Sequence, residues 1–336
     1  MKLKLSVIIP YYNADAWIGS VLDSLLDQDL SPADYEIIVV DDGSVEEPLQ
    51  LRRYVAENPT VIHYVRQENG GVSAARNTGI GLAKGDWLYF CDSDDLVQTQ
   101  VLGQMLALAE SNRLDMLFGR IHEVNPGESL PPSRKHFENL SPVWTGFEYI
   151  AAHPVMQGYG TYQYLIRRDF VETHQLRFRP YYFTEDRLYL LDSLFRAERV
   201  MEVDVDLYYY IQRESSIMHA QKRKHYEKKF CGPIRAYLSD LTSWTIDSSF
   251  PQDARKSLLL WRDVNSYYVL LDSFRYTSPQ TLAANMDLLR QLGAYPLMKR
   301  GNRTARLIRW WMNHRRLWMA GSRIYHFLPL AVREKL

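Results

Sequence analysis

The chain has 336 residues, 46% of them hydrophobic and 24% charged, and its formal net charge is zero. The length favours two domains, or one domain with a large appendage, and the composition is that of an ordinary globular protein. The charge balance argues against a protein that binds nucleic acid over its whole surface. Positive charge is nevertheless concentrated at the end of the chain, where residues 299–336 include ten Lys and Arg and a single acid, Glu334.

The first hundred residues alternate between short apolar runs and stretches of helical periodicity. Strands are predicted at 5–9, 35–40, 61–65 and 87–91. Helices are predicted at 16–26, 47–57 and 72–83. This alternation predicts an α/β fold, a Rossmann-like, mostly parallel sheet with helices on both faces.

Polar side chains follow three of these strands: Tyr11 and Asn13, then Asp41 and Asp42, then Asp92 and Asp94. Because the carboxyl ends of parallel strands lie on one edge of a sheet, we expect these side chains to converge. Crowded carboxylates repel one another unless a cation lies between them, and Mg²⁺ or Mn²⁺ is commonly shared with a substrate phosphate. The pattern therefore predicts a metal–diphosphate site. The alternative is a solvated acidic turn in which Ser93 or Asp94 caps the next helix.

Several other signatures are missing from the sequence. It has no dinucleotide fingerprint, P-loop, HExxH motif or zinc-type spacing of Cys and His. Its two cysteines are Cys91, in an apolar strand, and Cys231, so we expect a reduced, cytoplasmic protein. The apolar run at the N-terminus is too short for a signal peptide or a membrane span.

Four motifs in register resemble those of family 2 glycosyltransferases with the GT-A fold. They are SVIIPYYN at 6–13, DDGS at 41–44, NGGVSAARNTG at 69–79 and DSDD at 92–95. The resemblance is strong over residues 5–98 and weaker to about residue 220. It implies an inverting enzyme of the bacterial polysaccharide type that uses a nucleotide-sugar donor, most often a UDP-sugar, and a divalent metal, Mn²⁺ or Mg²⁺.

The resemblance also implies roles for individual residues. Asp41 is expected to hold the nucleobase or ribose, and Arg76 and Asn77 to shape the donor pocket. Asp92 and Asp94 resemble the DxD pair of the family, with Asp94 as the direct metal ligand. The other residues expected at the donor are Pro10, Tyr11, Asn13, Asp42, Ser93 and Arg213.

The segment after residue 98 is less regular. We predict a helix at 101–111, a strand at 115–120, an exposed loop at 125–141, a helix at 145–152 and extended chain at 159–166. Aromatic residues fill a further segment at 203–211. The family often has a Trp-x-Lys-Leu-Tyr segment where this chain has Tyr162–Ile166, which leaves the acceptor contacts open.

Two acids, Glu185 and Asp186, open a predicted helix after Thr184. A helix N-terminus favours negative charge, so helix capping alone explains the pair. The family resemblance implies a second role, in which Asp186 is the catalytic base and Glu185 a supporting or substitute acid. A single base and no protein nucleophile imply direct displacement with inversion at the anomeric carbon.

The expected site is completed by Arg213 and His219, which follow the aromatic segment. Arg213 is expected to contact the diphosphate. His219 is a candidate third metal ligand, and the alternative is an ordinary histidine of a surface loop.

From residue 222 the pattern is helical, with helices predicted at 230–244, 258–276, 279–292 and 303–326. The last helix is basic and amphipathic, with Trp on its apolar side and Arg306, Arg309, Arg316 and Arg323 on another face. This pattern suits peripheral contact with a membrane. It equally suits packing on the catalytic domain or a second subunit, with the arginines facing water.

The whole chain is thus predicted to contain a catalytic domain at 1–220, with a nucleotide-binding half at 1–98 and an acceptor half at 99–220, and a helical extension at 221–336. The predicted function is transfer of a sugar to a glycan or lipid-linked saccharide in surface polysaccharide biosynthesis, in the cytoplasm or at the inner face of the cell membrane. The alternatives are a nucleotidyltransferase acting on sugar phosphates and a catalytically degenerate protein that binds sugar nucleotides.

Overall fold

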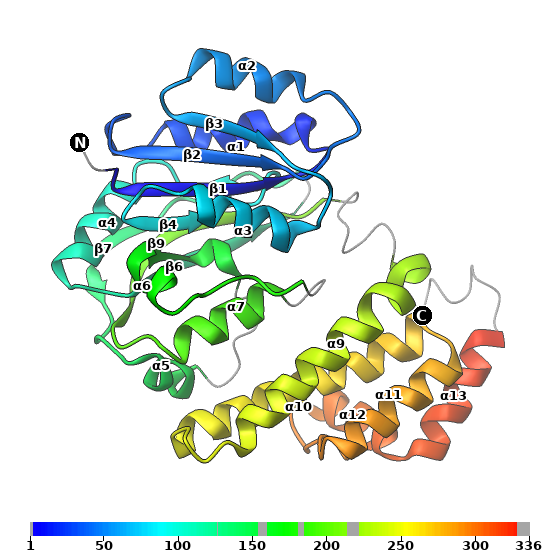
Figure 1. The fold of residues 1–336 in the computed structure, drawn as a ribbon. Helices are drawn as coiled ribbons and strands as arrows, with labels where there is room; N and C mark the ends of the chain where they lie inside the picture. Colours follow the sequence, from blue (N-terminus) through cyan, green and yellow to red (C-terminus); the bar gives the residue numbers. More distant parts are fainter. Residues whose placement is uncertain (1–2, 126, 154–159, 181–184, 214–221, 328–336) are drawn as a thin grey trace. The chain divides into compact units, whose positions relative to one another are not determined.

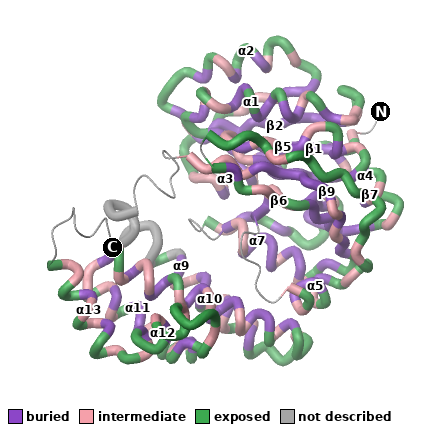
Figure 2. The backbone as a smooth tube through the Cα atoms, turned by 180° about the vertical axis from the view of Figure 1, so that it is seen from behind, coloured by how far each residue is buried: buried purple, intermediate pink, exposed green. Residues whose placement is uncertain are grey.

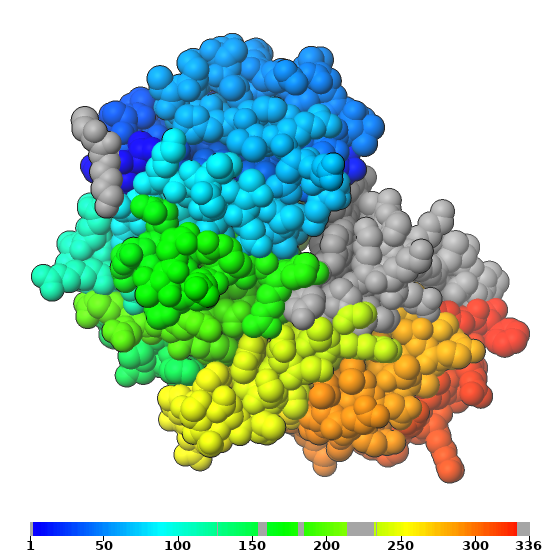
Figure 3. Space-filling model, in the orientation of Figure 1, coloured from blue at the N-terminus to red at the C-terminus, as the bar shows by residue number. Residues whose placement is uncertain are grey.

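The structure is a computed structural model that describes residues 3–125, 127–153, 160–180, 185–213 and 222–327. Two compact units divide the chain. The sheet unit comprises residues 1–149, 158–181 and 185–214, and the helical unit comprises 150–157, 182–184 and 215–336. In Figure 3 the blue and cyan atoms belong to the sheet unit, and the yellow to red atoms belong to the helical unit.

Four parallel strands form the first half of the sheet. They are β1 (Leu5–Tyr11), β2 (Tyr35–Asp41), β3 (Ile62–Arg66) and β4 (Trp87–Phe90), in the spatial order β3-β2-β1-β4. Along the sequence these strands alternate with three helices, α1 (Asp15–Leu26), α2 (Leu49–Glu57) and α3 (Val72–Leu82), which are labelled in Figure 1. The strands and helices predicted for the first hundred residues are therefore confirmed.

Helices cover both faces of this parallel half. Every residue of β1, β2 and β4 is buried. Along β2, Ile37 and Val39 pack in the core that contains α1, whereas Ile38 and Val40 pack with Ala75 of α3. Successive side chains of a strand point to opposite faces, so a strand that is apolar at every position is typical of a sheet covered on both sides.

The second half of the sheet is mixed. Its strands are β5 (Leu96–Val97), β6 (Met116–Val124), β7 (Lys135–Leu140), β8 (Tyr164–Arg167) and β9 (Val200–Ile211). The order continues from β4 as β8-β6-β9-β5, with β7 also paired to β9. Strand β6 is parallel to β9, and the other pairs are antiparallel. The helical elements here are α4 (Leu102–Ser111), α5 (Gly146–Ala152), the 3-10 turn η1 (Thr161–Gln163), α6 (Arg168–Thr173) and α7 (Glu185–Leu194).

Two predictions for this half were wrong in part. The segment 125–141, predicted as an exposed loop, contains β7. The segment 159–166, predicted as extended, contains η1 before β8 begins. Both errors have one cause, which is the lack of a periodic pattern. β7 is a polar strand at the margin of the sheet, and η1 is only three residues long, too short for a helical pattern.

The helical unit contains α9 (Lys222–Ile246), α10 (Gln252–Tyr276), α11 (Pro279–Gln291), α12 (Arg303–Asn313) and α13 (Arg315–Phe327). Helix α10 packs against α9, α11 and α13, and α12 packs against α13. The core side chains include Tyr237, Leu241, Trp261, Leu270, Met286, Met312 and Trp318. No helix in the described ranges is both long enough and apolar enough to cross a membrane.

The predicted helix at 303–326 is two helices, which corrects the prediction. The chain leaves helical geometry at His314, between α12 and α13. Arg309 was predicted to lie on a face away from the apolar side of the helix, but its side chain is buried and bonds to Asp263 of α10 at 2.6 Å. Helical periodicity continued across the break, so the pattern alone did not reveal it.

Candidate active site

The carboxyl ends of β1, β2 and β4 lie on one edge of the sheet, as predicted. β1 pairs with both other strands in parallel, and Tyr11 lies opposite Asp41. The amide of Cys91 then donates to the carbonyl of Ile8, so the chain after β4 continues alongside the end of β1. Residues near positions 11, 41 and 92 are thereby brought to one edge from separate parts of the sequence.

Asn13 and Asp41 join the loops that follow β1 and β2. The Asn13 side chain accepts a hydrogen bond from the amide of Val45 at 2.9 Å, and the Asn13 amide donates to Ser44 Oγ at 2.9 Å. Asp41 is fully buried and accepts from the Ser44 amide at 2.8 Å and from the Tyr64 hydroxyl at 2.7 Å. These bonds shape the edge of the sheet, and Pro10 and Tyr11 are buried within β1 beside it.

Asp42 organises the glycine turn that leads into α3. Its carboxylate accepts hydrogen bonds from the amides of Gly70 and Gly71, at 2.9 and 2.8 Å, and from the Gln67 side chain at 2.7 Å. Gly71 has a φ of +86°, in the region that favours glycine. In this structure Asp42 therefore positions the start of α3.

Arg76 of α3 links two acidic segments. Its guanidinium is buried and bonds to Asp92 at 2.9 Å and to Glu185 at 3.1 Å, and it lies 5.2 Å from the centre of the Phe178 ring. Burial alone would lower the pKa of an arginine, but the charges of Asp92, Glu185 and Asp186 raise the pKa of Arg76. The end of β4 and the start of α7 are thus held together by one cation.

Asn77, the neighbour of Arg76, contacts a different segment. Its side chain donates to the carbonyl of Phe178 at 2.9 Å and accepts from the amide of Phe178 at 2.8 Å. This two-way pairing ties α3 to the chain before α7 and occupies both ends of the amide. In this structure Asn77 holds the segment that supports Arg76.

The carboxylates after β4 lie close enough to perturb one another. Burial and the charge of Asp92 raise the pKa of Asp94 to about 6. Arg213, two residues after β9, donates to the carbonyl of Asp94 and places its Nε 3.8 Å from the Asp94 carboxylate. The Arg213 guanidinium also lies 5.2 Å from the centre of the Trp17 ring. Arg213 therefore lies beside Asp94, one residue of the predicted DxD pair, and its contact with a diphosphate stays a prediction.

Asp95 is a site residue that the sequence reasoning left without a role. It is buried and accepts hydrogen bonds from the Tyr208 hydroxyl and the Ile211 amide, both at 2.7 Å. Burial and the charges of Asp92 and Asp94 raise the pKa of Asp95 to about 8. Asp95 therefore links the turn at residues 92–95 to β9. Its place in a run of acids, together with the tyrosines at 208–210, was the available signal.

Tyr162 and Tyr208 form a stacked aromatic wall beside these acids. Their rings are 4.4 Å apart and nearly parallel, and the Tyr208 hydroxyl accepts from the amide of Asp92 at 3.2 Å. Burial raises the pKa of Tyr162, and the charges of Asp186 and Asp92 raise it further. Tyr162 stands where the family pattern was not matched, and the structure brings it near the site.

Glu185 and Asp186 lie at the start of α7, as predicted. Burial and the charge of Asp186 raise the pKa of Glu185 to about 7, although the charge of Arg76 offsets part of this rise. Burial also raises the pKa of Asp186. One oxygen of Glu185 bonds to Arg76, and the other is buried without a hydrogen-bond partner in the described structure. An unpaired buried carboxylate oxygen is costly, so this position favours a proton or an incoming donor group.

The carboxylates of Asp92 and Asp94 suit a divalent cation that is bound jointly by the protein and a substrate phosphate. Among the described residues, no group of three or more His, Cys, Asp and Glu side chains is arranged to hold a metal. Asp92 and Asp94 together offer carboxylate oxygens, and Mg²⁺ or Mn²⁺ is commonly held by one or two carboxylates with phosphate and water completing the sphere. Ser93 lies between them, partly buried. His219 lies outside the described residues.

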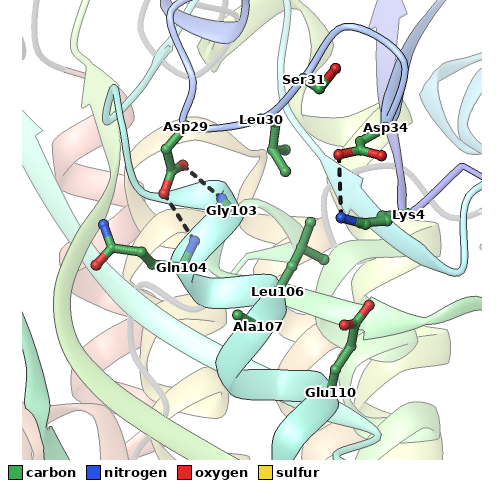
Figure 4. Close-up of a pocket in the computed structure, with 10 residues that line it drawn as sticks. All are labelled: Lys4, Asp29, Leu30, Ser31, Asp34, Gly103, Gln104, Leu106, Ala107 and Glu110. Carbon is green, nitrogen blue, oxygen red and sulfur yellow. Dashed lines mark hydrogen bonds and ion pairs between the residues drawn. The ribbon is translucent and has the colours of Figure 1, made fainter.

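A separate pocket of about 280 Å³ lies at the opposite edge of the sheet. Figure 4 shows Lys4 and Asp34, which immediately precede β1 and β2. It also shows Asp29, whose carboxylate accepts from the amides of Gly103 and Gln104 in the first turn of α4. In open α/β sheets, ligands bind at the carboxyl ends of the strands. This pocket is at the amino ends, and it contains none of the predicted site residues.

Comparisons with known proteins agree with this geometry. The model of the family described as "Glycosyl transferase family 2" matches residues 6–175. The chain is 31% identical over 240 residues to the uncharacterized glycosyltransferase EpsJ of Bacillus subtilis, with 69% of each chain covered. It is 28% identical over 272 residues to the poly(ribitol-phosphate) beta-glucosyltransferase of Bacillus spizizenii, and this match covers 79% of the chain but 40% of that protein.

A solved structure has a similar fold. The crystal structure of S. aureus TarS residues 1–349 in complex with UDP-GlcNAc aligns with a TM-score of 0.64 at 21% identity, covering 96% of this chain and 90% of that one. At this identity the likeness establishes the shared fold.

Proposed function

Because the chain belongs to glycosyl transferase family 2, and is therefore a glycosyltransferase with the GT-A fold, we propose that it is a metal-assisted, inverting enzyme. The observation that supports this mechanism best is the Arg76 bridge. It holds Asp92, at the carboxyl end of β4, close to Glu185 and Asp186 at the start of α7. A site for the leaving diphosphate and a site for the attacking hydroxyl are thereby adjacent.

On the donor side, Asp41 and the loops that it shapes receive the nucleoside, and Arg213 contacts the diphosphate. Asp92 and Asp94 would hold Mn²⁺ or Mg²⁺, which offsets the negative charge that develops on the departing diphosphate. Arg76 keeps Asp92 in place through the bond at 2.9 Å. Asp94 is partly exposed beside Arg213, so its carboxylate is accessible from the donor side.

On the acceptor side, Asp186 takes the proton from the attacking hydroxyl. A raised pKa makes an ionised carboxylate a stronger base, which suits proton abstraction from a sugar hydroxyl. Glu185, paired with Arg76, supports the same site. Because no protein nucleophile is involved, attack on the anomeric carbon inverts its configuration.

We further propose that the donor is a UDP-sugar and the acceptor a glycan or lipid-linked saccharide of a surface polysaccharide. The support is that the TarS structure contains UDP-GlcNAc and that the Bacillus spizizenii relative is named for transfer to poly(ribitol-phosphate). In this proposal residues 1–220 carry out catalysis, with donor binding in 1–98 and acceptor binding in 99–220, and the enzyme works in the cytoplasm at the inner face of the cell membrane.

The test is to incubate the purified full chain with Mn²⁺ and a panel of nucleotide sugars and to measure the released product, with a chelated sample as the metal-free control. Release of UDP supports the proposal. Release of pyrophosphate from a nucleoside triphosphate and a sugar phosphate would instead indicate a nucleotidyltransferase. Donor binding without either product would indicate a catalytically degenerate binding protein.

The base assignment is tested by Asp186→Asn. General-base catalysis contributes about 10²- to 10⁴-fold, so we expect transfer to fall by that factor while calorimetry shows unchanged donor binding. Asp192→Asn, on the same helix but paired with Arg179 at 2.9 Å, is the matched control and should keep its activity. Full turnover by Asp186→Asn would remove this residue from the mechanism.

A further inference from the structure

The outer faces of α12 and α13 expose apolar side chains that a folded core would normally bury. Leu307 and Trp310 on α12 are 64% and 51% exposed, and Leu317 and Ile324 on α13 are 49% and 65% exposed. Figure 2 shows most of α12 in the colour of exposed residues. We call these four residues the α12–α13 apolar face. Such groups of exposed apolar side chains mark interaction surfaces.

The inner faces of the same helices are already used for packing. Trp318 is buried, with its ring 4.3 Å from that of Phe274 on α10. Met312 is fully buried, and Arg309 is buried on Asp263. Because these inward residues account for the packing of α12 and α13, the outward apolar face is not needed to hold the helical unit together.

Arginines share the outward faces with these apolar residues. Arg303 lies about one turn from Leu307 and Arg306 about one turn from Trp310, and Arg316 and Arg323 are adjacent to Leu317 and Ile324 in sequence. All four arginines are exposed, and no acidic partner for them exists among the described residues. By contrast, Arg309 and Arg315 bond to Asp263 and Asp287. The outward faces therefore have unpaired positive charge beside the apolar side chains.

We propose that the α12–α13 apolar face and its four arginines bind the surface of an anionic lipid bilayer. Tryptophan and aliphatic side chains enter the boundary between headgroups and acyl chains, while arginines at the rim remain with the lipid phosphates. The sequence has no Asp or Glu between Asp287 and Glu334, so this surface would attract an anionic leaflet without local repulsion. With 11 and 13 residues, α12 and α13 lie on the bilayer, since spanning it takes about 20.

Two other occupants fit the surface less well. A second copy of this chain, docked through the same face, would place like-charged arginines opposite each other, which opposes association. A soluble polyanion would pair with the arginines but leave Trp310, Leu307 and Ile324 in water. Only a surface that is both apolar and anionic satisfies both kinds of side chain.

The experiment is sedimentation of the full chain with lipid vesicles. One set contains phosphatidylcholine alone, and the other contains about 30 mol % phosphatidylglycerol to supply the negative surface potential. We expect binding to the anionic vesicles only, weakening as salt is added, because salt screens the attraction. Equal binding to both vesicle types, or to neither, would overturn the proposal.

Variants locate the surface. Ile324→Ser is compared with Ile246→Ser, an equally drastic change at a residue of α9 that is 74% exposed. We expect several-fold weaker binding for the first and no change for the second. Arg306→Gln and Arg323→Gln should each weaken binding about fivefold, whereas Arg53→Gln on α2 should not. Equal effects of a variant and its control would overturn the assignment of the lipid-binding surface. The assignment would also fail if the parent chain did not bind vesicles but formed a dimer that Ile324→Ser abolished.

Vesicle binding is measured without donor or turnover. Its failure would therefore leave the proposed transferase mechanism intact, and failure of the transfer assay would leave the lipid surface intact. Circular dichroism melting of each variant confirms that the helices remain folded.

Discussion

Replacing Arg76 by methionine should lower the local stability around Asp92 and Glu185 more than any substitution at the protein surface. The side chain is buried and pairs with Asp92 at 2.9 Å and Glu185 at 3.1 Å. Methionine keeps much of the volume but removes the charge, so two carboxylates lose the cation that compensates their burial. Breaking a buried pair by removing one partner costs about 3–5 kcal/mol.

The loss of stability in Arg76→Met should depend on pH, and the direction of this dependence follows from the pKa of Glu185. This pKa is raised to about 7 even with Arg76 present, and without the cation it rises further. A carboxyl group whose pKa is higher in the folded than in the unfolded state adds stability below its unfolded pKa, and this stability is lost as pH rises through the folded value. Arg76→Met should therefore be least destabilised near about pH 5.5 and most destabilised near about pH 8.

Amide hydrogen exchange of α3 and β4 in the full chain measures this local stability, after correction for the intrinsic exchange rate at each pH. The matched control is Arg179→Met, whose partner is Asp192 and whose side chain is 37% exposed, so its loss should be below about 1 kcal/mol. The double variant Arg76→Met with Glu185→Gln should recover part of the loss. The reasoning is refuted if Arg76→Met matches Arg179→Met, or if its loss is the same at both pH values.

Two further predictions concern buried charges outside the Arg76 bridge. Asp95→Asn should destabilise the end of β9 by about 1–3 kcal/mol, because a side-chain amide cannot accept both of the hydrogen bonds that the carboxylate accepts there; unchanged exchange in β9 would contradict this role. Arg309→Met should cost the helical unit about 3–5 kcal/mol, because the buried Asp263 carboxylate loses its ion-pair partner. Arg315→Met, whose partner is half exposed, should cost less than about 1 kcal/mol. Exchange in α10 separates the two arginines, and equal losses would argue against the buried pair.

Much of the parallel half of the sheet was predictable because its signals are local. The run Leu5–Ile9, the run Tyr35–Val40 and the helical stripes between the strands each indicate their structure within one short window. Short connections between parallel strands then leave few possible arrangements. For this reason the convergence of residues near positions 11, 41 and 92 on one edge could be predicted without coordinates. The four sequence motifs then indicated the family.

The antiparallel half and the tail show where such reasoning stops. β7 is a polar strand whose pairing to β9 gives no apolar alternation, so it was predicted as a loop. The break at His314 occurs inside a continuous amphipathic pattern, because Trp311 before it and Trp318 after it both pack against Phe274 of α10. In both cases packing against distant segments determined the structure.

The sequence by itself determined the strands and helices of the first hundred residues, the edge at which acidic side chains gather and the family to which the chain is similar. Tertiary structure alone decided that Arg76 joins Asp92 to Glu185, which lies 109 positions after Arg76 in the sequence. It also decided that Asp95 bonds to β9 and that Arg309 is buried against Asp263. The physical reason is range. Backbone propensity and side-chain periodicity act between neighbours in the chain, whereas the partner of a buried charge is chosen by whichever segment the folded core places beside it.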